Sequence, residues 1–247
     1  MKRRLYVLLG AIAIFVASAA CAADETAFAT ANQAYGEQRF QEAAEGYESL
    51  VQSGKWNATL FYDLGNAYYR LGNFGKAILN YERALALEPR HPEAQANLRL
   101  ASDEARALEL RKDWIERYAA MATVKQYSLA AAAAFWIALL VTAHLVLSRR
   151  RSLGGIALIT LGLVICGVSI FGIYTLENGK RGDALAVVTA KEVEARLATA
   201  DNAKSVLLLP AGSEIKILSE RGGWVYVALP NDQRGWIPAT SAERVRL

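Results

Sequence analysis

The sequence predicts a multidomain α and β chain, with a helical-repeat region, a two-helix transmembrane hairpin and a small C-terminal β-barrel. Three observations lead to this prediction. Apolar and small residues recur at helical spacing up to about residue 118, two long apolar blocks follow, and short alternating strands begin after Asp183. Because the hydrophobic period changes along the chain, we expect separate domains.

The positive charge of the chain lies beside its apolar blocks. The formal net charge is +4 at pH 7. Two clusters of basic residues, Lys2 to Arg4 and Arg149 to Arg151, together carry six positive charges, which is more than this net charge. Nucleic-acid-binding proteins gather basic residues on a folded face, whereas these clusters lie where membrane topology requires them. We therefore expect no nucleic-acid partner.

Residues 1–23 have the pattern of a secretory signal peptide. Basic residues are followed by an apolar stretch from Leu5 and by small residues up to Ala23. We expect cleavage after Ala22 or Ala23. Lipidation of Cys21 and an uncleaved anchor are the alternatives, and in each case the residues that follow are exported.

Two further apolar blocks, residues 127–148 and 153–176, predict transmembrane helices. Each has roughly the 20 apolar residues that a spanning helix needs. The arginine-rich turn between them, residues 149–152, is expected in the cytoplasm. The sequence therefore predicts a two-pass protein of the bacterial inner membrane, with the lipid bilayer as one partner and both flanking domains on the periplasmic side.

The stretch from Ala58 to Pro92 resembles a tetratricopeptide repeat (TPR). Small residues stand where two helices of this repeat cross closely, and a proline ends the second helix. The repeat period of about 34 residues places Ala31, Ala43 and Tyr47 at positions equivalent to those of a second copy. We expect residues 24–118 to form about two repeats and a capping helix over 93–113. The consensus positions are occupied by Ala58, Phe61, Leu64, Gly65, Tyr68, Gly72, Ala77, Tyr81, Ala84 and Pro89.

The TPR resemblance implies a groove that binds a partner protein or peptide. Asparagine can bond a peptide backbone through both a donor and an acceptor, and tyrosine supplies a rigid apolar surface with a polar tip. The alternative is that these residue types simply suit a hydrated helix face. The groove residues that the resemblance implies are Asn32, Tyr35, Tyr62, Asn66, Tyr69 and Arg70.

After a short linker, residues 177–184, the pattern predicts a small barrel over residues 185–247. Short runs rich in β-branched and aromatic residues alternate with Gly- and Pro-containing turns. This order resembles the bacterial SH3 domain (SH3b), and the resemblance implies ligand contact near Tyr226 and Trp236. The alternative is that Trp224 and Trp236 are core residues. The hallmark positions of that family are occupied by Gly212, Trp224, Gly235, Trp236 and Pro238.

The order signal peptide, TPR, membrane hairpin and SH3-like domain resembles the last protein of the Bacteroides aerotolerance (Bat) operons. That resemblance implies partners among von Willebrand A-domain membrane proteins of a MoxR-type system. The only histidines are His91 and His144, and both cysteines lie in apolar segments, so we expect no enzyme, no cofactor and no metal site. The sequence predicts an adaptor or scaffold. The alternative is a module that binds peptidoglycan through the SH3-like domain.

Overall fold

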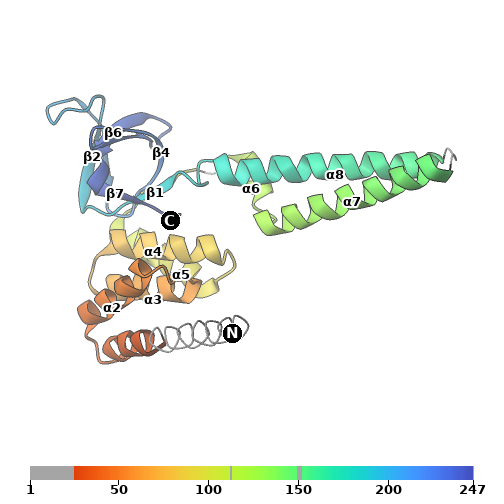
Figure 1. The fold of residues 1–247 in the computed structure, drawn as a ribbon. Helices are drawn as coiled ribbons and strands as arrows, with labels where there is room; N and C mark the ends of the chain where they lie inside the picture. The colour runs from red at the N-terminus through yellow and green to blue at the C-terminus, as the bar shows by residue number, and fades with distance from the viewer. Residues whose placement is uncertain (1–24, 112, 149–151, 247) are drawn as a thin grey trace, which may run out of the picture.

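The computed structural model describes residues 25–111, 113–148 and 152–246. The predicted signal peptide with Cys21, and the arginines of the predicted cytoplasmic turn, lie outside the described residues. The described chain forms a stack of helices, a curved antiparallel sheet beside that stack, and a long pair of helices that projects away from both (Figure 1).

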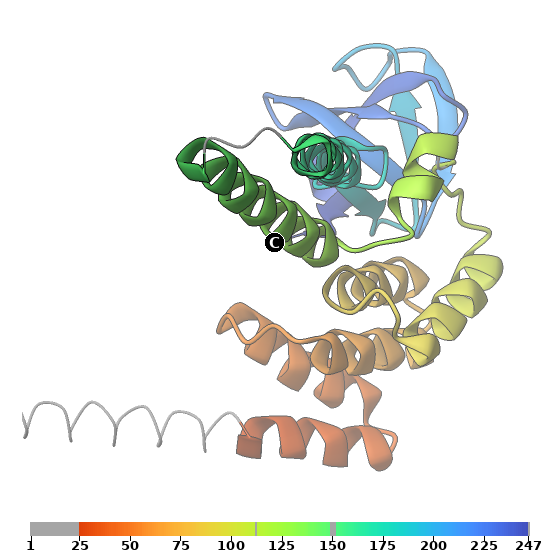
Figure 2. The same cartoon turned by 90° about the vertical axis from the view of Figure 1, so that its right-hand side faces the viewer.

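Helices in antiparallel pairs form the N-terminal region. Asparagine side chains cap the N-termini of two of these helices. The side chain of Asn57 accepts a hydrogen bond from the N–H of Leu60, and the side chain of Asn73 accepts one from the N–H of Lys76. The first helix lies farthest from the sheet, and α4 lies next to the sheet (Figure 2). The described part of the first helix is residues 25–36, and the others are α2 (Phe40–Gln52), α3 (Ala58–Arg70), α4 (Phe74–Leu87) and α5 (Pro92–Ala105).

The capping helix is shorter than the sequence predicts. It ends at Ala105, where Arg106 adopts the left-handed conformation with φ 50°. The segment that follows runs along the sheet instead. Within it, the N–H of Leu108 donates to Ser213 Oγ over 3.2 Å, and the Glu214 N–H donates to the Leu108 carbonyl over 2.8 Å. Strand-like pairing to the sheet thus replaces the last helical turns, although the sequence pattern alone continues the helix.

The long helix pair consists of α7 (Val124–Ser148) and α8 (Leu153–Asn178), preceded by the short α6 (Trp114–Ala119). Both long helices have the length and composition needed to cross a membrane. They pack closely where α8 has a small residue, since a Cβ added at Gly162 would lie 3.1 Å from the carbonyl oxygen of Ala134. Each helix is slightly longer than its predicted span. Helix α7 begins at residue 124 instead of 127, and α8 ends at residue 178 instead of 176.

The C-terminal region is one seven-stranded antiparallel sheet in the order β3-β2-β6-β5-β4-β1-β7. Buried aliphatic side chains such as Val188, Ile215 and Ile237 form its core. The described residues show no pairing between the edge strands β3 and β7, so the predicted closed barrel is an open, curved sheet. Its strands are β1 (Leu185–Val188), β2 (Glu192–Arg196), β3 (Ser205–Pro210), β4 (Glu214–Arg221), β5 (Trp224–Ala228), β6 (Arg234–Pro238) and β7 (Ala242–Arg244).

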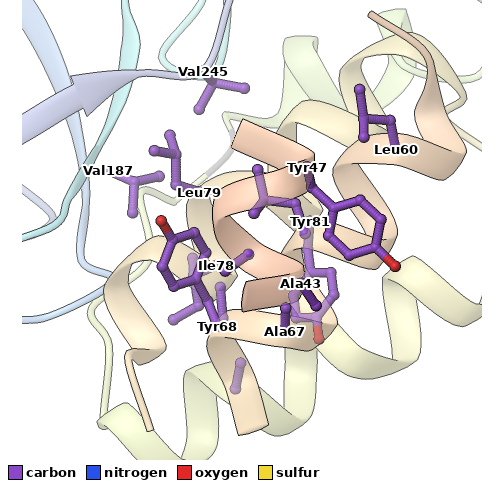
Figure 3. Close-up of a cluster of buried hydrophobic side chains, with 14 of the residues drawn as sticks. Ala43, Tyr47, Leu60, Ala67, Tyr68, Ile78, Leu79, Tyr81, Val187 and Val245 are labelled. Carbon is purple, nitrogen blue, oxygen red and sulfur yellow. The ribbon is translucent and has the colours of Figure 1, made fainter. Parts of the chain in front are cut away.

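The helical repeat and the sheet share one hydrophobic core. Ile78 and Leu79 of α4 are buried in the same cluster as Val187 and Val245, which come from the sheet side (Figure 3). The contact is close, because Gly212, with φ 81°, lies directly against Ile78. Burial of apolar surface between the two regions holds them in a defined arrangement.

An arginine in the predicted linker connects three elements. The guanidinium of Arg181, just after α8, donates to Glu82 of α4 and to Glu214 of β4, both over 2.5 Å. Glu214 is almost fully buried and also accepts from the Leu110 N–H over 3.0 Å. Burial raises the pKa of Glu214, and the attraction of Arg181 opposes this shift. The segment after α8 is therefore a fixed junction and not a free linker.

Candidate protein-interaction site

The two asparagines that the sequence singles out make the same contact in both helix pairs. The Tyr47 hydroxyl donates to Asn32 Oδ1 over 2.6 Å, and the Tyr81 hydroxyl donates to Asn66 Oδ1 over 2.8 Å. Asn97 of α5 donates a second hydrogen bond to Asn66 Oδ1, also over 2.8 Å. The side-chain oxygens of Asn32 and Asn66 therefore both accept hydrogen bonds within the fold. The side-chain amide N–H groups of the two asparagines have no hydrogen-bond acceptor among the described residues.

The predicted tyrosines also occupy equivalent places. The ring of Tyr35 meets Phe40 at a centroid distance of 5.3 Å, and the ring of Tyr69 meets Phe74 at 5.6 Å, both nearly edge to face. The Arg70 guanidinium lies 4.9 Å from the centroid of Phe40. The two ring pairs link the end of one helix to the start of the next, and Arg70 links the end of α3 to the start of α2.

Tyr62 extends this arrangement toward α5. Its ring lies 6.1 Å from that of Tyr81 and 5.0 Å from that of His91, measured between centroids. Its hydroxyl is 3.4 Å from Asn97 Nδ2. The structure therefore brings together all six predicted groove residues in contact networks of the repeat helices. We call this set the Asn–Tyr face: Asn32, Tyr35, Tyr62, Asn66, Tyr69 and Arg70.

Two residues of this region were missed by the sequence analysis. Asn97 joins the hydrogen-bond network described above, and Asp63 of α3 lies within electrostatic range of Tyr35, Tyr47 and His91. Burial raises the pKa of Asp63 to about 6, and His91 partly opposes the shift. The signal available in the sequence was that Asp63 is the only acidic residue in the stretch from Ala58 to Arg70.

The second predicted site lies on the outer side of the sheet. Tyr226 of β5 and Trp236 of β6 are directly paired across neighbouring strands, and their ring centroids are 5.0 Å apart. Both side chains are half-buried, whereas their neighbours Val225 and Ile237 are buried in the core. In the next strand, Arg196 is paired with Trp236. The two aromatic rings thus form a small surface platform beside a basic side chain.

Comparison with known protein families gives one match within the chain. Residues 58–91 match the tetratricopeptide repeat. They include α3 and α4, and the crossing of these helices explains Gly65, because a Cβ there would lie 2.6 Å from the Tyr81 ring. No protein of curated function matches the chain at a significant level. The TPR is a protein-interaction module, and the Asn–Tyr face includes four residues of the matched repeat.

Proposed function

We propose that this protein is a membrane-anchored adaptor whose Asn–Tyr face binds a segment of a partner protein. The observation that supports this most is that the sheet and the Asn–Tyr face use different residues of the helical region. Helix α4 packs on the sheet through Ile78 and Leu79, whereas the hydrogen bonds and ring contacts of the Asn–Tyr face, in the described part of the chain, involve only residues of the helical region, α5 included. The fold therefore leaves that face available to a partner.

The proposed anchor is the α7–α8 pair in the bacterial inner membrane. Most of its apolar side chains are exposed, including Leu147 and Leu153, and exposed apolar surface on this scale is typical of contact with lipid. The exposed Trp114 and Tyr118 of α6 suit the membrane interface. In this proposal, a signal peptide exports the TPR and sheet regions to the periplasm.

The sheet, in the same proposal, is an SH3-like domain that docks a second ligand at Tyr226 and Trp236. The partners implied by the resemblance to Bat proteins are von Willebrand A-domain membrane proteins of a MoxR-type system. The role is binding, with no catalytic step. The described residues contain no cluster of three or more His, Cys, Asp or Glu side chains that could hold a metal ion.

A second candidate function is attachment to peptidoglycan through the sheet. The pairing of Tyr226 with Trp236 at 5.0 Å favours it, since two neighbouring, half-buried aromatic rings can still present an apolar surface to a sugar or a peptide plane. Purified sacculi incubated with the full chain and with a Trp236→Ala variant test this function. Binding that is lost in the variant supports it, and equal sedimentation of both proteins, or of neither, contradicts it.

Photocrosslinking in intact cells tests the adaptor function. p-Benzoylphenylalanine replaces Tyr69 on the Asn–Tyr face in one strain and Leu87, which is 53% exposed on α4, in the matched control. We expect one or a few crosslinked proteins of defined mass from position 69 and not from position 87. The same products from both positions, or none from position 69, would contradict the proposal.

Topology is tested separately with an impermeant thiol reagent. Asp201 is exposed in the loop before β3, and an Asp201→Cys variant in a background with Cys21→Ser and Cys166→Ser provides one defined target. We expect labelling in spheroplasts without lysis, since the sheet is proposed to lie outside the inner membrane. Labelling that requires lysis would reverse the proposed orientation.

A further inference from the structure

A carboxylate without a partner lies at the Asn–Tyr face. Asp63 is half-buried in α3, and among the described residues it forms no hydrogen bond and no ion pair. Burial of an ionisable side chain that has no hydrogen bond and no ion pair disfavours its charged form. The fold therefore retains an acidic residue there that it does not itself neutralise.

The groups that face Asp63 come from three parts of the repeat. Tyr35 of the first helix and Tyr47 of α2 both have a raised pKa, to which the negative charge of Asp63 contributes after burial. His91, which precedes α5, lowers the pKa of Asp63 through its charge. The nearest cation of α3 itself, Arg70, is directed to the Phe40 ring at 4.9 Å. No lysine or arginine of the described chain forms an ion pair with this carboxylate.

The surroundings of Asp63 favour one class of side chain from a ligand. A lysine or arginine would pair with the carboxylate, and the neighbouring tyrosine rings would contact the cation and its aliphatic stem. The amide N–H groups of Asn32 and Asn66, which have no acceptor in the described chain, can donate to main-chain carbonyls of an extended segment. The hydroxyls of Tyr47 and Tyr81 hold both amides in position.

We propose that the Asn–Tyr face selects partner segments that carry a basic residue, whose cation pairs with Asp63. This inference rests on the proposed adaptor function and specifies its ligand. It also predicts a pH dependence. Since Asp63 has a pKa of about 6 in the unbound protein, its charge is present at pH 7.5 and largely lost at pH 5, so the selection weakens as the pH falls between these values.

The test uses the full chain in lipid nanodiscs and pools of labelled decapeptides. Each pool has one central position fixed as Arg, Lys, Ala or Glu, with the other positions random. The variant Asp63→Asn removes the charge and keeps the shape of the side chain. Asp201→Asn, on the exposed loop before β3, is the matched control for the change in net charge.

At pH 7.5 we expect the Arg and Lys pools to bind the native chain about tenfold more strongly than the Ala pool, which corresponds to one ion pair of roughly 1.4 kcal/mol. This preference falls to near parity in Asp63→Asn and persists in Asp201→Asn. Equal binding of all pools, or a basic preference that survives Asp63→Asn, overturns the inference and leaves the adaptor function intact. Absence of binding by every pool contradicts both.

Discussion

Gly75 of α4 lies against the main-chain carbonyl of Val188 on β1. A Cβ added at position 75 would be 2.9 Å from that oxygen and 3.1 Å from the Cα of Thr189. The neighbouring atoms belong to the backbone and cannot rotate away. This close approach of α4 to the backbone of the sheet therefore depends on the absence of a side chain at position 75.

The Gly75→Ala variant is expected to loosen this contact. Alanine favours helix by about 1 kcal/mol over glycine, but overpacking against backbone costs about 1–3 kcal/mol, so we expect a net loss of stability. Thermal unfolding of the full chain in micelles measures it. The control is Gly36→Ala, since a Cβ at Gly36 meets nothing within 4 Å. A Gly75→Ala protein as stable as the Gly36→Ala protein would contradict this account.

Arg181 is expected to be essential for the junction after α8. In an Arg181→Met variant, the side chains of Glu82 and Glu214 remain buried without their shared cation, which typically costs about 3–5 kcal/mol. Glu214→Gln, added to Arg181→Met, should recover part of the loss. Chemical unfolding of the three proteins measures these changes, and no recovery in the double variant would argue against the carboxylate as the cause.

The same variant has a predicted pH dependence. Burial raises the pKa of Glu214, and a group whose pKa is raised in the folded state contributes stability at low pH that is lost as the pH rises. Removal of Arg181 takes away the charge that opposes this shift. We therefore expect Arg181→Met to lose more stability, relative to the native chain, at pH 8 than at pH 5. The opposite order would be inconsistent with a buried carboxylate.

Asp63 gives a further stability prediction, with a defined pH window. Its pKa rises from 3.8 to about 6 on folding, so its ionisation destabilises the fold as the pH rises from about 4 to 7. We expect Asp63→Asn to be more stable than the native chain by about 1–2 kcal/mol at pH 7.5, after allowance for solvent screening, and equally stable at pH 4. Urea unfolding at both pH values measures the difference. Asp201→Asn should show no such dependence.

The repeated tyrosine–asparagine hydrogen bond allows an internal comparison. Tyr47→Phe and Tyr81→Phe each remove one bond, and a loss of about 0.5–1.5 kcal/mol is expected for each. In the second pair, Asn97 still donates to Asn66 Oδ1, so the acceptor stays satisfied. Thermal unfolding of both variants measures the losses, and a change far larger than this range in either would mean that the hydroxyl has another role.

The sequence predicted the elements whose hydrophobic periods are regular. The matched repeat at 58–91 follows its helical spacing, and the apolar blocks form the two long helices. The end of α5 could not be predicted, because the sequence of residues 106–113 continues the pattern of a helix, whereas Leu108 and Leu110 are bonded to Ser213 and Glu214 of the sheet region. Their partners are more than 100 positions away in the chain.

Local sequence patterns also could not predict the contacts between the helical region, the sheet and the segment after α8. Arg181 lies in a polar stretch typical of a linker, yet it pairs with Glu82, 99 positions earlier. In the candidate site, the asparagines and tyrosines of the Asn–Tyr face come from the TPR resemblance, and their role in binding stays a prediction. The resemblance did not identify Asp63, because the effect of this residue depends on its burial among side chains of other helices and not on its sequence neighbours.

Hydrogen–deuterium exchange tests the central claim most directly. The full chain in nanodiscs is measured alone and with the protein recovered by crosslinking from position 69. We predict slower exchange of the backbone amides in the helix of residues 25–36 and in α3, which carry the Asn–Tyr face, with little change in β5 and β6. Protection confined to β5 and β6, around Tyr226 and Trp236, would contradict the account and assign partner binding to the sheet.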